Sequence, residues 1–191
     1  MSLKNKRFTI TELPIKGATV VKRYQIGDER GFLSRLFCAE ELAHAGWKHP
    51  IIQINHTLTE RAGTVRGIHY QNPPYTEMKL VTCVRGEVWD VAVDLRQGSP
   101  TFLKWNAELL SAENGRALLI PEGFGHGFQT MTDNCELIYL HSEPYRAESE
   151  AGVRFDDPEL AIQWPLQIAV SSERDRSHPL ININFKGITI R

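Results

Sequence analysis

The chain consists largely of short segments rich in β-branched and apolar residues, and this pattern constrains its fold more than any other feature. Turn sequences such as Arg85-Gly86-Glu87 and Glu113-Asn114-Gly115 separate the segments. Residues 39–45 are typical of a helix ending near Gly46, and residues 157–161 of one helical turn. The predicted strands cover residues 19–24, 51–56, 79–85, 87–94, 102–110, 116–120, 127–132 and 136–141. So many strands with so little helix predict an all-β sandwich or barrel, and a double-sheet jelly roll fits their number and spacing.

Length and charge narrow the class of protein. The 191 residues fit one domain of moderate size, with no internal repeat or linker. The 22 basic residues are balanced by 23 acidic ones, which argues against nucleic acid or a membrane surface as a partner. No segment resembles a signal peptide or a membrane span, and the three cysteines are widely spaced without a CxxC pair. We therefore expect a soluble cytoplasmic protein with reduced cysteines.

Strict alternation in residues 87–94 places Val88, Asp90, Ala92 and Asp94 on one face of a strand. Two carboxylates therefore share a face with small apolar side chains. The simpler interpretation, which we favour, is a partly exposed sheet face. The alternative is a polar, ligand-facing interior.

One histidine with two cationic residues near it in sequence is the best candidate for a reactive site. Arg66 and Lys79 bracket His69 in the run Arg66-Gly67-Ile68-His69-Tyr70-Gln71 and the strand after it. An imidazole accepts a proton near neutral pH, and the two cations stabilise an anion beside it. Proton removal next to a carbonyl fits this set, and so does phosphate recognition. From these residues alone we predict a small anionic ligand, with proton transfer as one possible reaction.

A bound metal is not expected. Metal-binding jelly rolls usually combine two closely spaced histidines and a glutamate with a later histidine after a Pro-x-Gly turn. Here Pro121-Glu122-Gly123 precedes His126, but no second histidine follows His69 two positions on. Two histidines are too few for a divalent site.

Several segments, taken in order, resemble the dTDP-4-dehydrorhamnose 3,5-epimerase family of the cupin superfamily. They span residues 27 to 180 and include GDERGF (27–32), QINH (53–56), VRGIHYQ (65–71), GEVWDVAVD (86–94), GSPTF (98–102), LSAEN (110–114), IPEGF (120–124), HGF (126–128), DDP (156–158) and WP (164–165). The resemblance implies a cupin double-stranded β-helix and a cofactor-free epimerase that acts on a nucleotide-diphosphate sugar. It also implies a homodimer that exchanges N-terminal strands.

The resemblance also implies roles for individual residues. His69 corresponds to the base, Asp175 to a carboxylate bonded to its Nδ1, and Tyr139 to the proton donor. A phenol is a sensible acid for an enolate if the site lowers its pKa from about 10. Lys79 corresponds to the cation that holds the enolate oxygen. The positions that line the sugar and phosphate pocket fall on Arg30, Gln53, Asn55, Arg66 and His126.

Three stretches depart from the family pattern. Arg35 stands where an acid is usual and Pro144-Tyr145 where two aromatics are common, so Arg35 and Tyr145 are candidate determinants of nucleotide and sugar recognition. The loop 73–78, before Lys79, replaces a small loop containing glutamine. A single-position epimerase, a 3,4-ketoisomerase and a non-catalytic sugar-nucleotide binding module are the alternatives.

Overall fold

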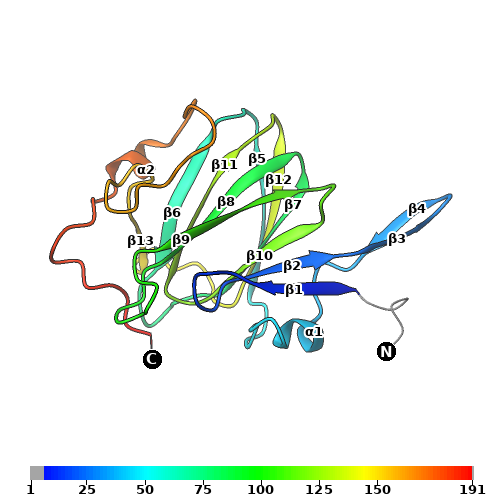
Figure 1. Ribbon diagram of the computed structural model, residues 1–191, viewed down its shortest axis with the longest axis horizontal. Coiled ribbons are helices and arrows are strands. Elements are labelled where there is room, and N and C mark those ends of the chain that lie inside the picture. Colours follow the sequence, from blue (N-terminus) through cyan, green and yellow to red (C-terminus); the bar gives the residue numbers. More distant parts are fainter. Residues whose placement is uncertain (1–6, 191) are drawn as a thin grey trace.

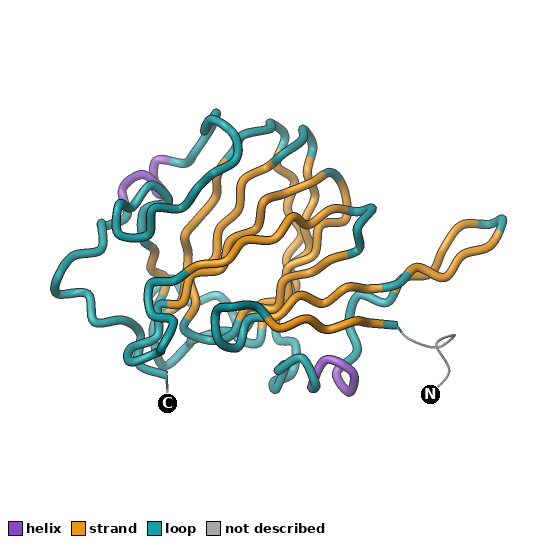
Figure 2. The backbone as a smooth tube through the Cα atoms, in the orientation of Figure 1, coloured by secondary structure: helices purple, strands orange, loops and turns teal. Residues whose placement is uncertain are grey.

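Two antiparallel sheets face each other in the computed structural model, which describes residues 7–190 (Figures 1 and 2). The six-stranded sheet has the order β1 (Phe8–Glu12), β2 (Thr19–Arg23), β10 (Arg116–Ile120), β7 (Lys79–Arg85), β12 (Cys135–His141) and β5 (Gln53–Thr59). The five-stranded sheet has the order β13 (Glu150–Gly152), β6 (Val65–Gln71), β11 (Phe124–Thr130), β8 (Glu87–Asp94) and β9 (Trp105–Ser111). The predicted all-β jelly roll is confirmed.

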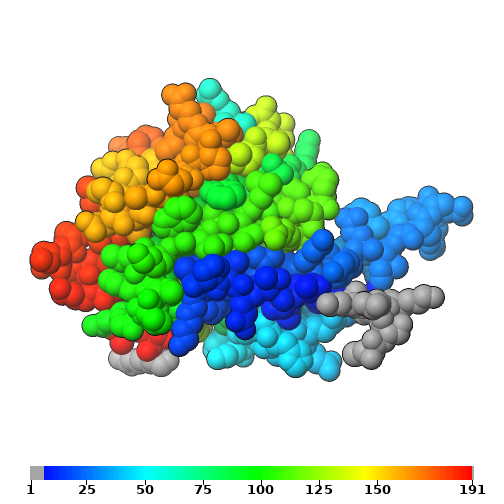
Figure 3. Space-filling model, in the orientation of Figure 1, coloured from blue at the N-terminus to red at the C-terminus, as the bar shows by residue number. Residues whose placement is uncertain are grey.

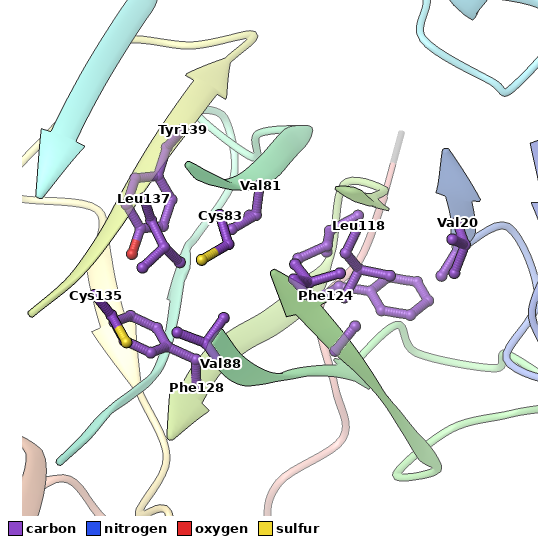
Figure 4. Packing of buried hydrophobic residues seen from close by; sticks show 14 of the residues in the cluster. Val20, Val81, Cys83, Val88, Leu118, Phe124, Phe128, Cys135, Leu137 and Tyr139 are labelled. Carbon is purple, nitrogen blue, oxygen red and sulfur yellow. The ribbon is translucent and has the colours of Figure 1, made fainter. Parts of the chain in front are cut away.

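The core fills the space between the two sheets. Val81, Leu118 and Leu137 point into it from the six-stranded sheet, toward Val88 and Phe128 of the five-stranded sheet (Figure 4). All five are buried because each strand turns alternate side chains inward. This packing fixes the relative positions of the strands that carry the site.

The alternating face of β8 lies in the interior, so the favoured interpretation of a partly exposed face is wrong. Val88 and Ala92 belong to the central cluster, and Asp90 and Asp94 have no exposed surface. Buried carboxylates need partners. Asp94 binds the guanidinium of Arg96, which is 2.7 Å away at its closest, and Asp90 contacts a histidine of β11.

Several elements escaped the sequence prediction. The strands β1, β6 and β13 were not predicted, nor were the helix α2 (Glu173–Ser177) and the hairpin of β3 (Gln25–Asp28) and β4 (Gly31–Ser34). Helix α1 (Ala39–Ala43) lies within the predicted residues 39–45. The strand expected from residue 102 begins only at Trp105, because Leu103 has a φ of 60°. In residues 157–161 the Ala161 N–H donates to the Asp157 carbonyl, which makes the expected single turn.

The β3–β4 hairpin projects away from the sandwich (Figures 1 and 3). Its apolar residues are exposed, with 65% of Phe32 and 70% of Leu33 open to solvent. No helix within residues 7–190 has the length and apolar character needed to cross a membrane.

Candidate active site

A cavity of about 580 Å³ collects most of the predicted site residues. Its walls come from β5, β6, β7, β11 and β12, together with the segment that contains α2. Nine of the predicted residues line it: Gln53, Asn55, Arg66, His69, Lys79, His126, Tyr139, Tyr145 and Asp175.

A histidine–aspartate pair lies at the centre of one wall. The His69 Nε2 is 2.7 Å from an oxygen of Asp175, whose side chain is 3% exposed. Burial opposes ionisation of Asp175, but the hydrogen bond and charge of His69 outweigh it and lower the pKa of this carboxyl. The predicted pair therefore forms, although through Nε2 and not through the expected Nδ1. An Nε2–H that donates to Asp175 leaves the ring's free lone pair on Nδ1.

Glycine explains how β6 brings this histidine to the cavity. Gly67 has a φ of 116°, and a Cβ atom there would lie 2.5 Å from the Gly127 Cα of β11. Only glycine allows the two backbones to approach so closely. The pairing also shifts register at this point, and His69 lies opposite His126. The Arg-Gly-x-His spacing is thus a requirement of local packing as well as of chemistry.

Tyr139 lies between two histidines. Its ring centroid is 5.9 Å from that of His126 and 6.1 Å from that of His141. Burial raises the pKa of the Tyr139 phenol, and the charge of Asp90 acts in the same direction while Arg66 opposes it. The condition named for a good acid, a lowered pKa, is therefore not met, because desolvation outweighs the nearby cation. The phenol stays protonated, which is the form that a proton donor needs.

Lys79 forms a buried ion-pair network on the opposite sheet. Its ammonium lies 3.1 Å from one oxygen of Glu77, and His141 Nδ1 lies 2.7 Å from the other. Burial opposes ionisation of Glu77, yet the charge of Lys79 and the contact with His141 lower its pKa. Lys79 is therefore held in place at the cavity wall by a carboxylate that its own charge keeps ionised.

Asp90 of β8 holds His126 in place. Both oxygens of Asp90 are within 3.1 Å of His126 Nε2. Burial raises the pKa of Asp90, although His126 and Lys79 oppose this effect. The alternative for the alternating face of β8 was a polar, ligand-facing interior. Asp90 does not line the cavity itself, but it orients His126, which does.

Polar side chains surround the cavity mouth. The Tyr145 hydroxyl donates to Glu150, which also pairs with Arg174 at 2.9 Å. Gln53 accepts from the Tyr145 backbone N–H, and its amide donates to Asn55 at 3.1 Å. The amide and guanidinium N–H groups at these positions are of the kind that donate to phosphate and hydroxyl oxygens.

Arg30 and Arg35 do not line the cavity of their own chain. Arg30 is in the β3–β4 turn and pairs with Asp28, whereas Arg35 follows the hairpin and pairs with Glu41. The prediction that they share the cavity with His69 is wrong within one chain, because the hairpin projects away from the sandwich.

Five cavity or neighbouring residues were missed. Glu77 and His141 form the lysine network, Glu150 and Arg174 lie at the mouth, and the His178 ring is 5.6 Å from the His69 ring. A usable signal existed for His141, which ends the strand of Tyr139 two positions on and therefore shares its face. Within residues 7–190, only His69, Asp175 and His178 form a group of three that could hold a metal ion.

Comparisons with known proteins show which family the chain is similar to. A family model described as dTDP-4-dehydrorhamnose 3,5-epimerase matches residues 12–182. The protein of that name from Shigella flexneri is 43% identical over 86% of this chain and 90% of its own. A dTDP-4-dehydrorhamnose 3-epimerase from Streptomyces niveus is 41% identical over 88% and 82%. The crystal structure of the Bacillus anthracis 3,5-epimerase with TDP and PPi bound has a TM-score of 0.88 and 38% identity, and the match covers 91% of this chain and 99% of that one.

Proposed function

The chain belongs to the dTDP-4-dehydrorhamnose 3,5-epimerase family, and on this basis we propose that it inverts C3 and C5 of a dTDP-linked 4-keto-6-deoxyhexose in deoxysugar biosynthesis. One observation carries the proposal for this chain. The His69–Asp175 pair, the protonated phenol of Tyr139 and the ammonium of Lys79 line the same cavity. A base, an acid and a cation are the three groups that an enolate mechanism requires.

His69 removes the proton. The C4 ketone acidifies the hydrogens at C3 and C5, and the free lone pair on Nδ1 accepts one of them. The ring then becomes a cation, which the Asp175 carboxylate stabilises through the 2.7 Å contact at Nε2. The same contact fixes the ring before the reaction.

Lys79 stabilises the enolate that results. The side chain of Lys79 is 11% exposed, so its ammonium acts in a region where little water screens the charge. Glu77, which His141 contacts in turn, holds Lys79 at the wall, so little reorganisation is needed when charge develops on the substrate oxygen.

Tyr139 donates its phenolic proton to the other face of the sugar. Its raised pKa keeps it protonated until a strongly basic enolate carbon is present. It lies on β12 of one sheet and His69 on β6 of the other, so the two groups approach the sugar from different walls. Inversion follows from this arrangement.

A nucleotide diphosphate occupies the mouth. Arg66, Arg174, Gln53 and Asn55 provide donors for phosphate and sugar oxygens there. The Bacillus anthracis relative was crystallised with TDP and PPi, and a Legionella pneumophila relative with dTDP-4-keto-L-rhamnose.

The functional unit is a homodimer of one-domain chains. The exposed apolar hairpin residues Phe32 and Leu33 match the exposed Ile54 and Leu58 of β5, which among the described strands pairs only with β12. Placing the hairpin of one chain on the β5 edge of the other covers both. It also brings Arg30 and Arg35 toward the partner's cavity. Phe32→Asp should therefore shift sedimentation from dimer to monomer, whereas a monomeric wild-type protein contradicts the arrangement.

A single-position epimerase is the second candidate. The Streptomyces niveus relative, named a 3-epimerase, is nearly as similar to this chain as the 3,5-epimerases are. The proposed base, acid and cation serve either reaction, since both reactions include an enolate step at C3.

Solvent deuterium incorporation tests the proposal. The protein is incubated with dTDP-4-keto-6-deoxyglucose in D₂O, with a protein-free control, and the sugar is analysed by NMR. Deuterium at both C3 and C5 is expected, and deuterium at one carbon identifies the single-position epimerase. Movement of the ketone from C4 to C3 identifies the ketoisomerase. Binding without exchange of any 4-keto sugar contradicts an enzymatic function and leaves the binding module.

A further inference from the structure

We propose that His69, Asp175 and His178 form a binding site for a divalent transition metal such as Zn²⁺, and that occupancy of this site inhibits the enzyme. Each residue offers one ligand atom, and the three atoms lie within 4.8 Å of one another. Two imidazoles and a carboxylate are a common zinc donor set. The metal site rests on geometry alone, whereas its inhibitory effect rests on the proposed function.

Helix α2 and strand β6 present the three ligands. Asp175 and His178 are three residues apart in α2 and its C-cap, so they lie on the same side of one turn. The Ser172 hydroxyl accepts from the Asp175 N–H at 3.0 Å and fixes this turn. His69 faces them from β6, with its ring edge-on to that of His178 at 71°. The arrangement is therefore anchored by secondary structure on both sides.

His178 has a nitrogen that the described structure leaves unused. Its Nε2 is buried and has no hydrogen-bond partner among residues 7–190. A Cβ atom at position 152 would lie 2.6 Å from this nitrogen, so Gly152 makes the room that the ring occupies. A buried polar atom without a hydrogen-bond partner destabilises the fold. A metal ion bound through either ring nitrogen would give this imidazole a function that no hydrogen bond among residues 7–190 supplies.

Small movements are enough to accommodate the ion. Ligand atoms of tetrahedral zinc lie roughly 3.4 Å apart when the bonds are about 2.1 Å long. The His69 Nε2 and the Asp175 oxygen, now at 2.7 Å, would separate slightly while His178 moves inward. Arg174 opposes a cation, since its guanidinium is 3.5 Å from His69 Nε2. However, its side chain is 54% exposed and paired with Glu150, so it is able to turn toward solvent.

Metal binding at Nε2 removes the base. The ion replaces the proton that His69 shares with Asp175, and in a neutral ring the proton then resides on Nδ1. No lone pair is left to accept a proton from the sugar. This set differs from the pair of histidines that the cupin pattern suggested, because His126 is held by Asp90 and is not a member.

Direct metal titration tests the site. Chelator-treated full-length protein is titrated with Zn²⁺ in competition with a chromophoric chelator. We expect one equivalent per chain, and at least about a tenfold loss of affinity in His178→Gln and His178→Ala. The exposed His44, at the end of α1, provides the matched control, and His44→Gln should bind as wild type does. Thermal melting checks that each variant is folded. Wild-type protein that binds no Zn²⁺, or His178 variants that bind it equally well, would overturn the site.

A second measurement separates this site from the proposed function. Zn²⁺ should inhibit the deuterium exchange of the wild-type enzyme reversibly, and His178→Gln should need at least about tenfold more Zn²⁺ for the same inhibition. Exchange that persists at saturating Zn²⁺ refutes the inhibition. Zn²⁺ binding that depends on His178, in a protein that exchanges no sugar, supports the metal site and contradicts the proposed function. An active enzyme that binds no Zn²⁺ supports the proposed function and contradicts the metal site.

Discussion

Asp175→Asn should lower kcat by about 10- to 150-fold with little change in KM. The Asp175 carboxylate contacts His69 Nε2 at 2.7 Å and accepts the Gly67 N–H at 3.4 Å. Asparagine keeps the shape and one accepting oxygen for His69, so the negative charge and the longer 3.4 Å contact with Gly67 are lost. That charge matters most when His69 has taken the substrate proton. A hydrogen bond to a charged group contributes about 1.5–3 kcal/mol, and each 1.36 kcal/mol changes a rate roughly tenfold.

Steady-state kinetics of epimerised product formation measures the effect. Asp156→Asn is the control, because Asp156 pairs with Arg154 at 2.7 Å and does not line the cavity. It should leave both kinetic constants unchanged. Melting temperatures confirm that both variants are folded. A change in kcat of less than about threefold in Asp175→Asn, or a loss confined to KM, would refute the reasoning.

Two further predictions concern other cavity residues. Tyr139→Phe should abolish inversion while deuterium still enters the sugar with retention, because His69 exchanges the abstracted proton with D₂O and returns a deuteron to the same face. Inverted product at the wild-type rate would exclude Tyr139 as the donor. Burial opposes ionisation of Glu77, but Lys79 and His141 lower its pKa in the folded protein. The ionised carboxylate therefore stabilises the fold fully at a pH above the ordinary glutamate pKa of about 4.5. This stabilisation is lost as the pH falls through the lower pKa of the folded state. The loss in unfolding free energy on Glu77→Gln, measured with urea, should therefore be largest near neutral pH and shrink below pH 4.5, and a difference that grows with acidity would contradict this.

Local patterns predicted the elements that obey simple periodicity. Strands β7, β8, β10 and β12 lie close to their predicted positions, since each is a continuous apolar or alternating run. Strand β6 was missed because Gly67 interrupts its pattern, and only the approach of β11 explains that glycine. The interior position of Asp90 was also misjudged. A carboxylate on a strand is usually exposed, and its partner His126 lies 36 residues away.

The site depended on the fold. The family resemblance supplied Tyr139 and Asp175, which lie far from His69 in sequence yet share its cavity. Sequence could not supply the ring nitrogen that faces Asp175, or the direction of the Tyr139 pKa shift, since both depend on how side chains pack. The Glu77–His141 network was missed for the same reason. For Arg30 and Arg35 the resemblance predicted a place in the cavity, but the fold of one chain does not bring them there.

The central claim is that His69 is the base, and the rate of deuterium entry at C3 tests it most directly. His69→Asn keeps a polar side chain of similar size but has no basic nitrogen. If His69 takes the proton, the folded variant should exchange at least about 100-fold more slowly than wild type, which is the lower range of general-base contributions. Exchange within about tenfold of the wild-type rate would show that another group removes the proton.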